Sequence, residues 1–303
     1  MKVLIIGLGS IAKKHIDVLM ELYNDIVIYS LRSSEKSEKY LKVINIFSLK
    51  DVVNINFDFC IISSPTAHHL EDIKKVLHLD LPLFIEKPLF SSLDDKGLLK
   101  VINEKKINTY VACNLRFLDS LLYVKNNYLN DDYLKINEVN VYCGSYLPEW
   151  RPNRDYKKSY SANAVLGGGV HIDLIHEIDY VFWFFGKPKN TIRSCKSKST
   201  LAINAIDYAN FTLFYDNFTT SVILNYYRRD AKRCMEIVFD DYTVKVDLLK
   251  NCVYQNNKLI YKSEQKLIET YKPQLQYFLN NIRNNNSFNS VDEAFEVLKI
   301  SLH

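Results

Sequence analysis

An aspartate, a histidine and a glutamate stand among mostly apolar residues in one segment of the 303-residue chain, "GGGVHIDLIHEIDY" at residues 167–180. They are Asp173, His176 and Glu177. A buried helix normally avoids such groups unless they have partners or a task. At about 100° per residue, one helix through the segment would carry all three on one face and its apolar residues on a separate stripe. We therefore expect this face to border a substrate and to include a group that exchanges a proton.

A lysine is the second candidate for chemistry. Lys87 stands in Glu86-Lys87-Pro88, directly after the predicted strand Leu83–Ile85. A lysine at the end of a strand can hold a positive charge near a reacting oxygen. The bond to proline restricts the backbone of Lys87 to extended or turn geometry and allows a cis peptide. A surface Glu-Lys pair is the alternative interpretation.

The first 23 residues indicate the fold that would position Lys87. "KVLIIGLGSIAKKHIDVLMELY" predicts a strand at Val3–Ile6, a tight turn and a helix. The turn fits the G-x-G-x-x-G/A pattern, in which glycines allow the turn and the approach of a pyrophosphate, and the helix N-terminus faces the phosphates. We expect the cofactor to contact this turn at Gly7, Gly9, Ser10, Ile11 and Ala12.

The end of the second predicted strand, Asp25–Ser30, bears on the choice of nucleotide. Sites that prefer NAD usually carry an acid there, about 20 residues after the glycines. This chain instead reads Ser30-Leu31-Arg32. Because arginine and serine can hold a 2′-phosphate, we predict Ser30 and Arg32 as cofactor residues and favour NADP over NAD. A solvated loop arginine is the alternative.

Strands continue to alternate with helices up to about residue 115. A buried strand at Phe57–Ser63 is followed by a turn at Pro65, a helix, and the strand that ends at Lys87. This alternation predicts an α/β fold with a parallel, right-handed, doubly wound sheet, in which ligands bind beyond the carboxyl ends of the strands. At that edge we predict further cofactor contacts from Ser63, Pro65, His69, Glu86 and Lys87.

Three stretches together resemble one known family, the Gfo/Idh/MocA oxidoreductases, named for glucose–fructose oxidoreductase and inositol dehydrogenase. The stretches are "GLGSIAKKH", "FIEKPLF" and "LGGGVHIDLIHEIDYVFWFFG". The resemblance implies an N-terminal NAD(P)-binding Rossmann domain, at residues 1–115, and a C-terminal α+β domain with a large open antiparallel sheet, at residues 116–303. It also implies oxidation or reduction of sugars, cyclitols or their derivatives with NAD(P).

The resemblance also implies residue roles. The family's lysine corresponds to Lys87 and its aspartate to Asp173, whereas its usual histidine falls at Glu177, one residue after His176. We choose His176 as the acid–base group, because it stays on the same helical edge and neutral histidine takes a proton near neutral pH. Lys87 would stabilise alkoxide character, and Asp173 would orient a substrate hydroxyl or the histidine. A structural histidine and a carboxylate favoured by the helix dipole are the alternatives.

A long polar segment precedes the glycines, "RPNRDYKKSYSANAVLGGG". We expect it to form a loop over the cleft, where its Tyr, Arg and Lys side chains could present stacking faces and forked donors to a sugar or phosphate. Arg116 follows a predicted strand and is also expected to face the cleft, with an ion pair between domains as the alternative. The predicted substrate contacts are Arg116, Trp150, Arg151, Tyr160, Asp173 and His176.

The remaining sequence predicts a sheet and two helices. From Asn190 to Tyr261, β-branched and aromatic runs separated by Asp-Asn, Arg-Asp and Asp-Asp turns indicate an antiparallel meander. Two helices follow from Tyr271, with the turn between them at Asn284–Asn286. In the family that the chain resembles, the outer face of such a sheet commonly forms a subunit interface. We therefore expect a homo-oligomer, a dimer or a tetramer.

Composition narrows the class of protein. The 39 basic and 35 acidic residues are well mixed, which argues against nucleic acid or an anionic membrane as a partner. Six scattered cysteines without CxxC spacing predict no metal site and favour reduced thiols in a cytoplasmic protein. The apolar run that ends at Gly7 is too short for a secretion signal, and no stretch approaches the roughly 18 apolar residues of a membrane span.

These observations lead to one leading hypothesis: transfer of hydride between a nicotinamide cofactor and a hydroxyl or carbonyl carbon of a sugar, sugar phosphate or nucleotide-sugar. The particular sugar, the carbon and the reaction direction are left open. Two alternatives are an enzyme that recycles a tightly bound cofactor in a net non-redox sugar conversion, and a non-catalytic sensor of NAD(P).

Overall fold

The computed structural model describes residues 1–36, 38–94, 96–129, 135–283 and 289–303. These residues form two compact units, Met1–Cys113 with Tyr271–Leu298, and Asn114–Thr270 with Lys299–His303. The first unit therefore includes a segment that the linear division at residues 115 and 116 assigned to the second domain. The predicted turn at Asn284–Asn286 lies outside the described residues.

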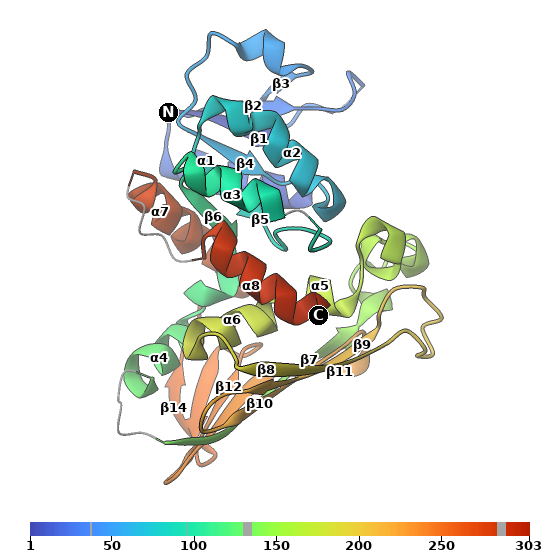
Figure 1. Cartoon of the computed structure of the whole chain (residues 1–303), viewed down its shortest axis with the longest axis vertical. Helices are drawn as coiled ribbons and strands as arrows, with labels where there is room; N and C mark the ends of the chain where they lie inside the picture. Colours follow the sequence, from blue (N-terminus) through green and yellow to red (C-terminus); the bar gives the residue numbers. More distant parts are fainter. Residues whose placement is uncertain (37, 95, 130–134, 284–288) are drawn as a thin grey trace. The chain divides into compact units, whose positions relative to one another are not determined.

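The first unit is built on a six-stranded parallel sheet with the order β3-β2-β1-β4-β5-β6 (Figure 1). The strands are β1 (Lys2–Ile6), β2 (Val27–Leu31), β3 (Ile44–Ile46), β4 (Phe59–Ile62), β5 (Leu83–Glu86) and β6 (Thr109–Ala112). The helices between them are α1 (Ser10–Leu22), α2 (His69–Val76) and α3 (Lys96–Glu104). The order reverses between β1 and β4, so right-handed crossovers place α1 on one face and α2 and α3 on the other. The predicted doubly wound parallel sheet is confirmed.

Hydrophobic periodicity accounts for these elements. Residues 3–5 of β1 are completely buried, as are all four residues of β4, because helices cover both faces of the sheet. Helix α1 buries Ala12, His15, Ile16 and Leu19, which recur at the spacing of one helical face. His15 is the polar exception in that stripe.

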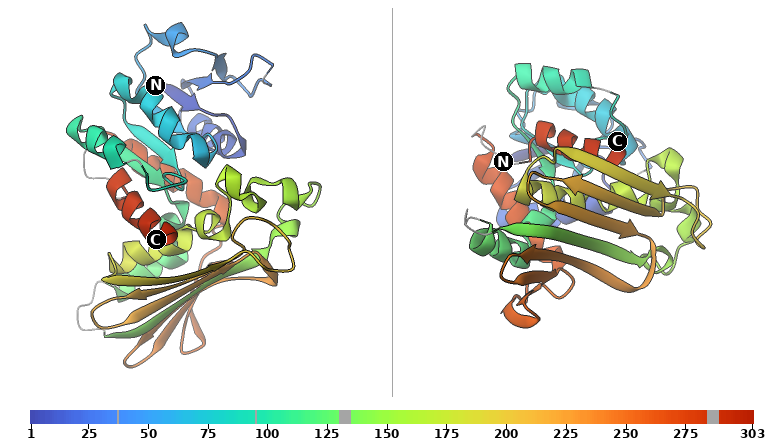
Figure 2. Two further views of the ribbon diagram at one scale, coloured as in Figure 1. Left: turned by 45° about the vertical axis from the view of Figure 1, so that its right-hand side comes forward. Right: turned by 60° about the horizontal axis from the view of Figure 1, so that its bottom comes forward.

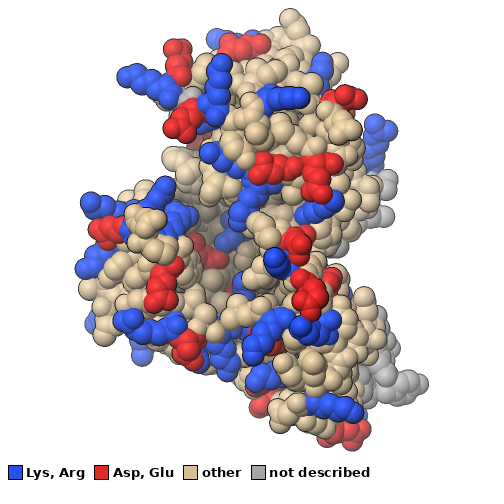
Figure 3. Space-filling view, turned by 180° about the vertical axis from the view of Figure 1, so that it is seen from behind, with Lys and Arg blue, Asp and Glu red and all other residues tan. Residues whose placement is uncertain are grey.

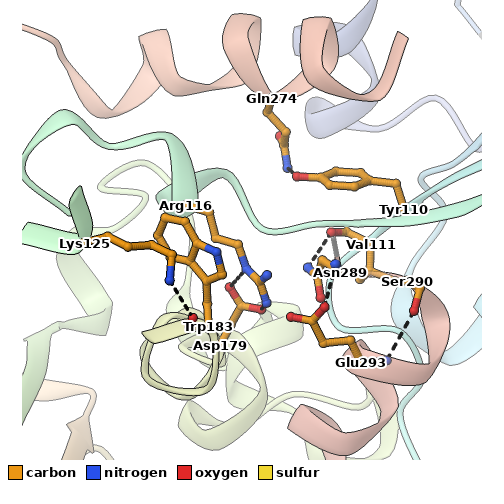
Figure 4. A network of polar contacts seen from close by, with 10 residues as sticks. All are labelled: Tyr110, Val111, Arg116, Lys125, Asp179, Trp183, Gln274, Asn289, Ser290 and Glu293. Atoms are coloured by element: carbon orange, nitrogen blue, oxygen red, sulfur yellow. Dashed lines mark hydrogen bonds and ion pairs between the residues drawn. The ribbon is translucent and has the colours of Figure 1, made fainter. Parts of the chain in front are cut away.

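A helix from the end of the chain completes the first core. Helix α7 (Tyr271–Asn281) places the ring of Phe278 5.3 Å from Phe59 and 5.4 Å from Phe84. Its Gln274 side chain lies beside the Tyr110 hydroxyl of β6 at 3.4 Å (Figure 4). Helix α7 therefore belongs to the core of the first unit, although it lies far from the strands of that unit in the sequence. It covers aromatic side chains that would otherwise lack an apolar neighbour.

The second unit holds an eight-stranded sheet with the order β14-β13-β12-β11-β7-β10-β9-β8. The strands are β7 (Ile136–Tyr146), β8 (Asn190–Lys196), β9 (Tyr208–Phe214), β10 (Thr219–Asn225), β11 (Tyr227–Phe239), β12 (Thr243–Asp247), β13 (Cys252–Gln255) and β14 (Lys258–Lys262). All neighbours are antiparallel except β7 and β10, which pair in parallel. The large, mostly antiparallel sheet is confirmed, but the single meander is wrong, because β7 inserts between two shorter meanders, β8–β10 and β11–β14.

The predicted Arg-Asp turn is also wrong. Arg229 and Asp230 lie inside β11, at a register shift between the ladder pairs of Tyr227 and Lys232. The extra residues bulge out of the ladder instead of reversing the chain, because β7 offers hydrogen-bonding partners on both sides of the shift.

Helices cover one face of the second sheet. Figure 2 shows α4 (Asp119–Tyr128) and α6 (His176–Phe185) on that face, and no described element of the same unit over the other. Strand β9 follows the expected alternation: Ala209, Phe211 and Leu213 are completely buried, while the residues between them are partly exposed. The last helix, α8 (Val291–Leu302), begins in the first unit and ends in the second.

The surface bears out the balanced composition. On the face drawn in Figure 3, Lys and Arg side chains are interspersed with Asp and Glu. In the described part of the chain, no helix has both the length and the apolar composition needed to cross a bilayer.

Candidate functional site

The glycine turn of the first unit is packed against the end of the neighbouring strand. Gly7 has a φ of +84°, and a Cβ there would lie 2.7 Å from the Cα of Ser64. Ser63 is buried and donates a hydrogen bond from its hydroxyl to the carbonyl oxygen of Gly7, at 2.9 Å. Only glycine combines this conformation with this close approach. The ends of β1 and β4 are thus held together at the carboxyl edge of the sheet.

Gly9 has a different role in the same turn. It is the N-cap of α1, and no described atom lies within 4 Å of the position that its Cβ would take. Ser10 is exposed and Ile11 partly exposed, so the first backbone N–H groups of α1 border open space. Ala12 is completely buried and packs the helix against the sheet. This arrangement fits an anionic pyrophosphate at the helix N-terminus.

The structure separates the two residues predicted for a 2′-phosphate. Ser30 is completely buried inside β2, so its hydroxyl has no surface to offer a ligand, and this prediction is wrong. Its side chain projects to a covered face of the sheet, because successive residues of a strand face opposite sides. Arg32 is partly exposed just after β2, with Nη1 3.4 Å from the Glu38 carbonyl oxygen and 3.5 Å from Asn45 Oδ1.

Lys87 lies where the sequence predicted, directly after β5. Its side chain is partly exposed, and the Lys87–Pro88 peptide is cis. Glu86 was predicted to contact the cofactor, but its side chain is paired with a buried histidine. The distance between His15 Nε2 and Glu86 Oε1 is 2.5 Å. The two side chains are 0% and 9% exposed. Glu86 is therefore engaged inside the unit, because a carboxylate that enters the interior needs a partner there.

His69, another predicted cofactor residue, is also turned inward. It is 1% exposed, and its ring nitrogens lie 2.9–3.2 Å from three backbone carbonyl oxygens, those of Ser64, Pro88 and Leu89. Burial lowers the pKa of His69, while the carbonyl contacts oppose that effect. Pro65, by contrast, is exposed at the end of β4 and is free of this inward packing. His69 thus organises backbone instead of presenting a side chain to a ligand.

In the second unit, the segment with three ionisable groups is two helices instead of one. Helix α5 (Val170–Asp173) ends at the aspartate, and α6 begins at His176. Leu174 leaves the helical conformation, with φ −97° and ψ 30°. The single face predicted for Asp173, His176 and Glu177 is therefore wrong. Asp173 and His176 are each partly exposed at a helix end, whereas Glu177 is completely buried.

Asp173 has a partner that the sequence did not reveal. Tyr226, completely buried between β10 and β11, donates a hydrogen bond from its hydroxyl to Asp173 Oδ2 at 2.6 Å. Burial and the nearby carboxylate raise the pKa of Tyr226 well above its usual range, so the hydroxyl stays a donor. The two residues are 53 positions apart, and a tyrosine in a strand gives no local signal of this contact.

Glu177 is a structural residue. Its Oε1 accepts a hydrogen bond from Nε of Arg233, on β11, at 2.6 Å, and its side chain is 0% exposed. Although burial disfavours the charge of the guanidinium, the Glu177 carboxylate raises the pKa of Arg233. A carboxylate held in this way has neither the exposure nor the freedom to exchange protons with a substrate.

Arg116, predicted to face the cleft, is buried too. Both its exposed fraction and that of Asp179 are at most 1%, and Arg116 Nε and Nη2 donate to the two Asp179 oxygens at 2.9 and 2.7 Å (Figure 4). The Arg116 guanidinium also lies 5.7 Å from the Trp183 ring. The substrate role is therefore wrong, and the ion pair predicted as its alternative is present, but within the second unit.

The loop before the glycines carries the remaining predicted substrate residues. Trp150 is 40% exposed, donates from Nε1 to Ser145 Oγ at 2.8 Å, and meets the Tyr226 ring edge-on at 5.3 Å. The Tyr160 hydroxyl donates to the carbonyl oxygen of Gly167 at 2.7 Å. Arg151 is exposed. Trp150 thus packs against Tyr226, the partner of Asp173, and Tyr160 is close enough to Tyr226 to affect its pKa.

No cluster of three or more metal-ligating side chains occurs among the residues that the structure describes. Of the three residues predicted to be catalytic, Lys87 lies in the first unit and Asp173 and His176 lie in the second, and each is partly exposed. A Rossmann sheet with an open glycine turn defines a class: proteins that bind a dinucleotide at the carboxyl edge of a parallel sheet.

Comparison with known proteins identifies the family. A model described as "Oxidoreductase family, NAD-binding Rossmann fold" matches residues 1–112, and its companion, "Oxidoreductase family, C-terminal alpha/beta domain", matches residues 134–237. Together they cover more than half of the chain. The chain belongs to the Gfo/Idh/MocA oxidoreductase family, as its three motifs predicted.

Two curated relatives are similar in sequence. Glucose-6-phosphate 3-dehydrogenase of Bacillus subtilis is 25% identical over 195 residues, which cover 61% of this chain and 53% of the relative. The rhizopine catabolism protein MocA of Rhizobium meliloti is 25% identical over 147 residues, 48% of this chain and 43% of the relative. The chain thus matches only about half the length of these relatives.

Solved structures share the whole fold. UDP-N-acetylglucosamine 3-dehydrogenase from Acidithiobacillus ferrooxidans has a TM-score of 0.80 at 16% identity, covering 99% of this chain and 95% of the other. Myo-inositol 2-dehydrogenase from Lactobacillus plantarum has a TM-score of 0.78 at 21% identity, with the same coverage. At these identities the likeness concerns the fold alone.

Proposed function

We propose that the protein is an NAD(P)-dependent oxidoreductase that transfers hydride to or from a hydroxyl or carbonyl carbon of a carbohydrate. The observation that carries this proposal is the open Gly9 turn at the N-terminus of α1, two strands away from Lys87 at the same edge of the sheet. A dinucleotide lying along this edge would have its pyrophosphate at the turn and its nicotinamide toward Lys87. Membership of the oxidoreductase family supports the same interpretation.

The chain's own residues would act as follows. The bound nicotinamide supplies the hydride acceptor or donor. Lys87 offers a positive charge to the oxygen that gains alkoxide character. His176, partly exposed at the start of α6, takes the hydroxyl proton or returns it. Asp173, oriented by Tyr226, holds a substrate hydroxyl or the histidine ring.

The histidine is the better candidate for the proton because of what surrounds its neighbour. Glu177 is held at 2.6 Å by Arg233 and is completely buried. Removing its charge by protonation would leave the largely buried guanidinium of Arg233 without its counterion. A change in the protonation of His176 leaves the ion pair of Glu177 and Arg233 intact.

The substrate that we favour is a sugar, a sugar phosphate or a nucleotide-sugar. Trp150 and Tyr160 offer aromatic rings near Tyr226, the partner of Asp173. Arg151 is exposed and offers a forked cation that suits a phosphate. The names of similar proteins, a glucose-6-phosphate 3-dehydrogenase and a UDP-N-acetylglucosamine 3-dehydrogenase among them, agree with this range. The particular sugar is a matter for a mass-spectrometric screen of sugar phosphates and nucleotide-sugars with NAD and with NADP.

Three further features belong to the proposal. We favour NADP because Arg32 is partly exposed after β2. We favour a homo-oligomer because one face of the second sheet has no described cover within its unit. We favour a reducing compartment, the cytoplasm, because all six cysteines are free.

The test uses Lys87→Met and His176→Ala in the purified full chain. With the substrate from the screen, both variants should lose hydride transfer, followed at 340 nm, while cofactor binding persists. Near-normal turnover in both would refute the assignment. His78→Ala, a change at an exposed histidine, is the matched control and should leave turnover unchanged.

The same preparation separates the alternatives. Cofactor that survives gel filtration, together with net non-redox conversion of a sugar, would indicate a recycling enzyme. Cofactor binding without turnover on any sugar would indicate a sensor. Exchangeable cofactor with substrate-dependent absorbance at 340 nm is the outcome that we expect.

A further inference from the structure

We propose that two buried histidines, His15 and His69, are positioning residues that hold Lys87 from both sides. His15 fixes the residue before the lysine, and His69 fixes the two residues after it. The significance for catalysis rests on the proposed function, but the structural claim stands on contacts within the first unit alone. We call this arrangement of His15, Glu86, Pro88, Leu89 and His69 the histidine clamp.

The first arm comes from the cofactor-binding helix. His15 lies on α1, six residues after the open Gly9, and is completely buried. Its Nε2 meets Glu86 Oε1 at 2.5 Å, while Phe84 and Tyr271 pack edge-on against its ring at 4.9 and 5.7 Å. A buried histidine enclosed by aromatic rings has little rotameric freedom, so the carboxylate that it holds is fixed as well. The arm therefore ties the end of β5 to α1.

The second arm comes from the helix on the other face of the sheet. His69 is the first residue of α2 and is 1% exposed. Its Nδ1 lies 3.0 Å from the carbonyl oxygen of Pro88 and 3.2 Å from that of Leu89, and its Nε2 lies 2.9 Å from that of Ser64. Ser64 in turn abuts Gly7 of the glycine turn. A neutral ring donates a hydrogen bond through one nitrogen only, so it bonds to one of these segments and packs against the carbonyl group of the other. The arm in this way brings the backbone after Lys87 against the end of β4.

These contacts fix the residues on either side of Lys87, and the lysine itself is partly exposed. The lysine side chain is long and flexible, so the direction of its Cα–Cβ bond decides what volume the ammonium group can reach. A misplacement of about 1 Å at a reacting group can cost on the order of 100-fold in rate. Neither histidine has the exposure to touch a ligand, so their effect on the reaction would pass through Lys87.

The atoms involved suggest a sharp set of variants. The amide nitrogen of glutamine can replace a histidine Nε2 donor, and that of asparagine can replace an Nδ1 donor. His15→Gln should keep its arm, and His15→Leu should lose it. His69→Asn should keep the contacts to Pro88 and Leu89, whereas His69→Gln should keep only the contact to Ser64. His68→Leu changes the exposed histidine next in sequence and is the control.

Two readouts should be compared in the full chain. The first is kcat, with the cofactor Kd measured in parallel: we expect a decrease of about 10- to 100-fold for His15→Leu and His69→Gln, and near-wild-type values for His15→Gln, His69→Asn and the control. The second needs no turnover: the rate at which acetic anhydride acetylates Lys87, followed by peptide mass spectrometry and normalised to the exposed Lys100. It should change in the same two variants and in no others.

The outcomes distinguish the clamp from the proposed function. If wild type transfers no hydride but the acetylation rate follows the predicted pattern, the clamp stands and the proposed function fails. If Lys87 acetylation and kcat in folded His15→Leu and His69→Gln equal those of the control, the clamp is refuted, whatever the activity of the wild type. The conservative variants keep the test decisive if a leucine variant does not fold, because His69→Asn and His69→Gln must then differ from each other.

Discussion

The hydroxyl of Tyr226 donates a hydrogen bond to the carboxylate of Asp173, with 2.6 Å between the two oxygens. The contact joins the junction of β10 and β11 to the end of α5, where the helix breaks before His176. Asp173 thus owes its direction to a strand residue outside the glycine-rich segment. This gives the first of five predictions.

Tyr226→Phe should reduce kcat/KM for the sugar about tenfold or more, since a hydrogen bond to a charged group contributes roughly 1.5–3 kcal/mol. The fold should persist, because the ring remains in place against Trp150. Steady-state kinetics would measure the effect, and Tyr227→Phe, at the exposed neighbour, is the control. Equal kinetics in the two variants would show that the hydrogen bond does not serve the substrate.

Substitutions of Glu177 and of His176 should have different effects, the first on the stability of the fold and the second on turnover. Glu177→Gln leaves Arg233, whose side chain is 14% exposed, without a counterion and should lower the free energy of unfolding by up to about 3 kcal/mol. His176→Gln should change that free energy by less than about 0.5 kcal/mol, because its side chain is partly exposed, and should abolish turnover. Urea denaturation and kinetics on both variants provide the comparison. Loss of turnover in a stable Glu177→Gln protein would reverse our choice of acid–base group.

Arg116 should behave as part of a buried ion pair. Arg116→Met leaves Asp179 buried and unpaired, which should cost about 3–5 kcal/mol in unfolding free energy. Adding Asp179→Leu should restore much of that loss, because no isolated charge then remains. KM for the sugar should not change in either protein that folds. A higher KM with unchanged stability would instead support the substrate role predicted from the sequence.

Arg32 should determine the preference for the 2′-phosphate. Arg32→Glu replaces a cation with an anion after β2 and should lower kcat/KM for NADP about tenfold or more relative to that for NAD. Lys36→Glu makes the same change of charge at an exposed position four residues later and should have a smaller effect. Parallel assays with both cofactors give the ratio. An unchanged ratio in Arg32→Glu would assign the arginine to the solvated loop.

His171 should make stability depend on pH. Burial, assisted by Arg193, lowers the pKa of His171 to about 4, from an unfolded value near 6.5. Between these values the unfolded chain binds more protons, so stability is present above about pH 6.5 and is lost as pH falls toward 4. The shift corresponds to at most about 3 kcal/mol. His171→Gln should flatten the dependence of the unfolding free energy on pH in this window, whereas His68→Gln should not. The same slope in wild type and His171→Gln would contradict the assignment.

Local patterns were sufficient for the framework of the first unit. The turn at Gly7 and Gly9, the strand that ends before Lys87, and the alternation of strands with helices all lie within short windows of sequence. Such windows determine backbone geometry directly, because glycine conformations and hydrophobic periodicity are local properties. The parallel sheet and the family therefore followed from the sequence.

The partners of the buried polar groups could not be predicted from the sequence. Arg116 and Asp179 are 63 residues apart, and Glu177 and Arg233 are 56 residues apart. A helical period predicts which residues share a face, but it does not predict where a helix breaks or which charge is buried against which. The break after Asp173 therefore escaped detection, although the glycines before it were correctly interpreted as the approach to a helix.

The sequence by itself determined the dinucleotide-binding framework, the position of Lys87 and the short list of ionisable groups that could act with it. Only the tertiary structure decided the duty of each group: Glu86, Glu177 and Arg116 are held by buried partners, while Asp173 and His176 keep exposed surface. The physical reason is that an ionisable side chain takes its role from its burial and its neighbours. Those neighbours come from distant parts of the chain and meet only when it folds.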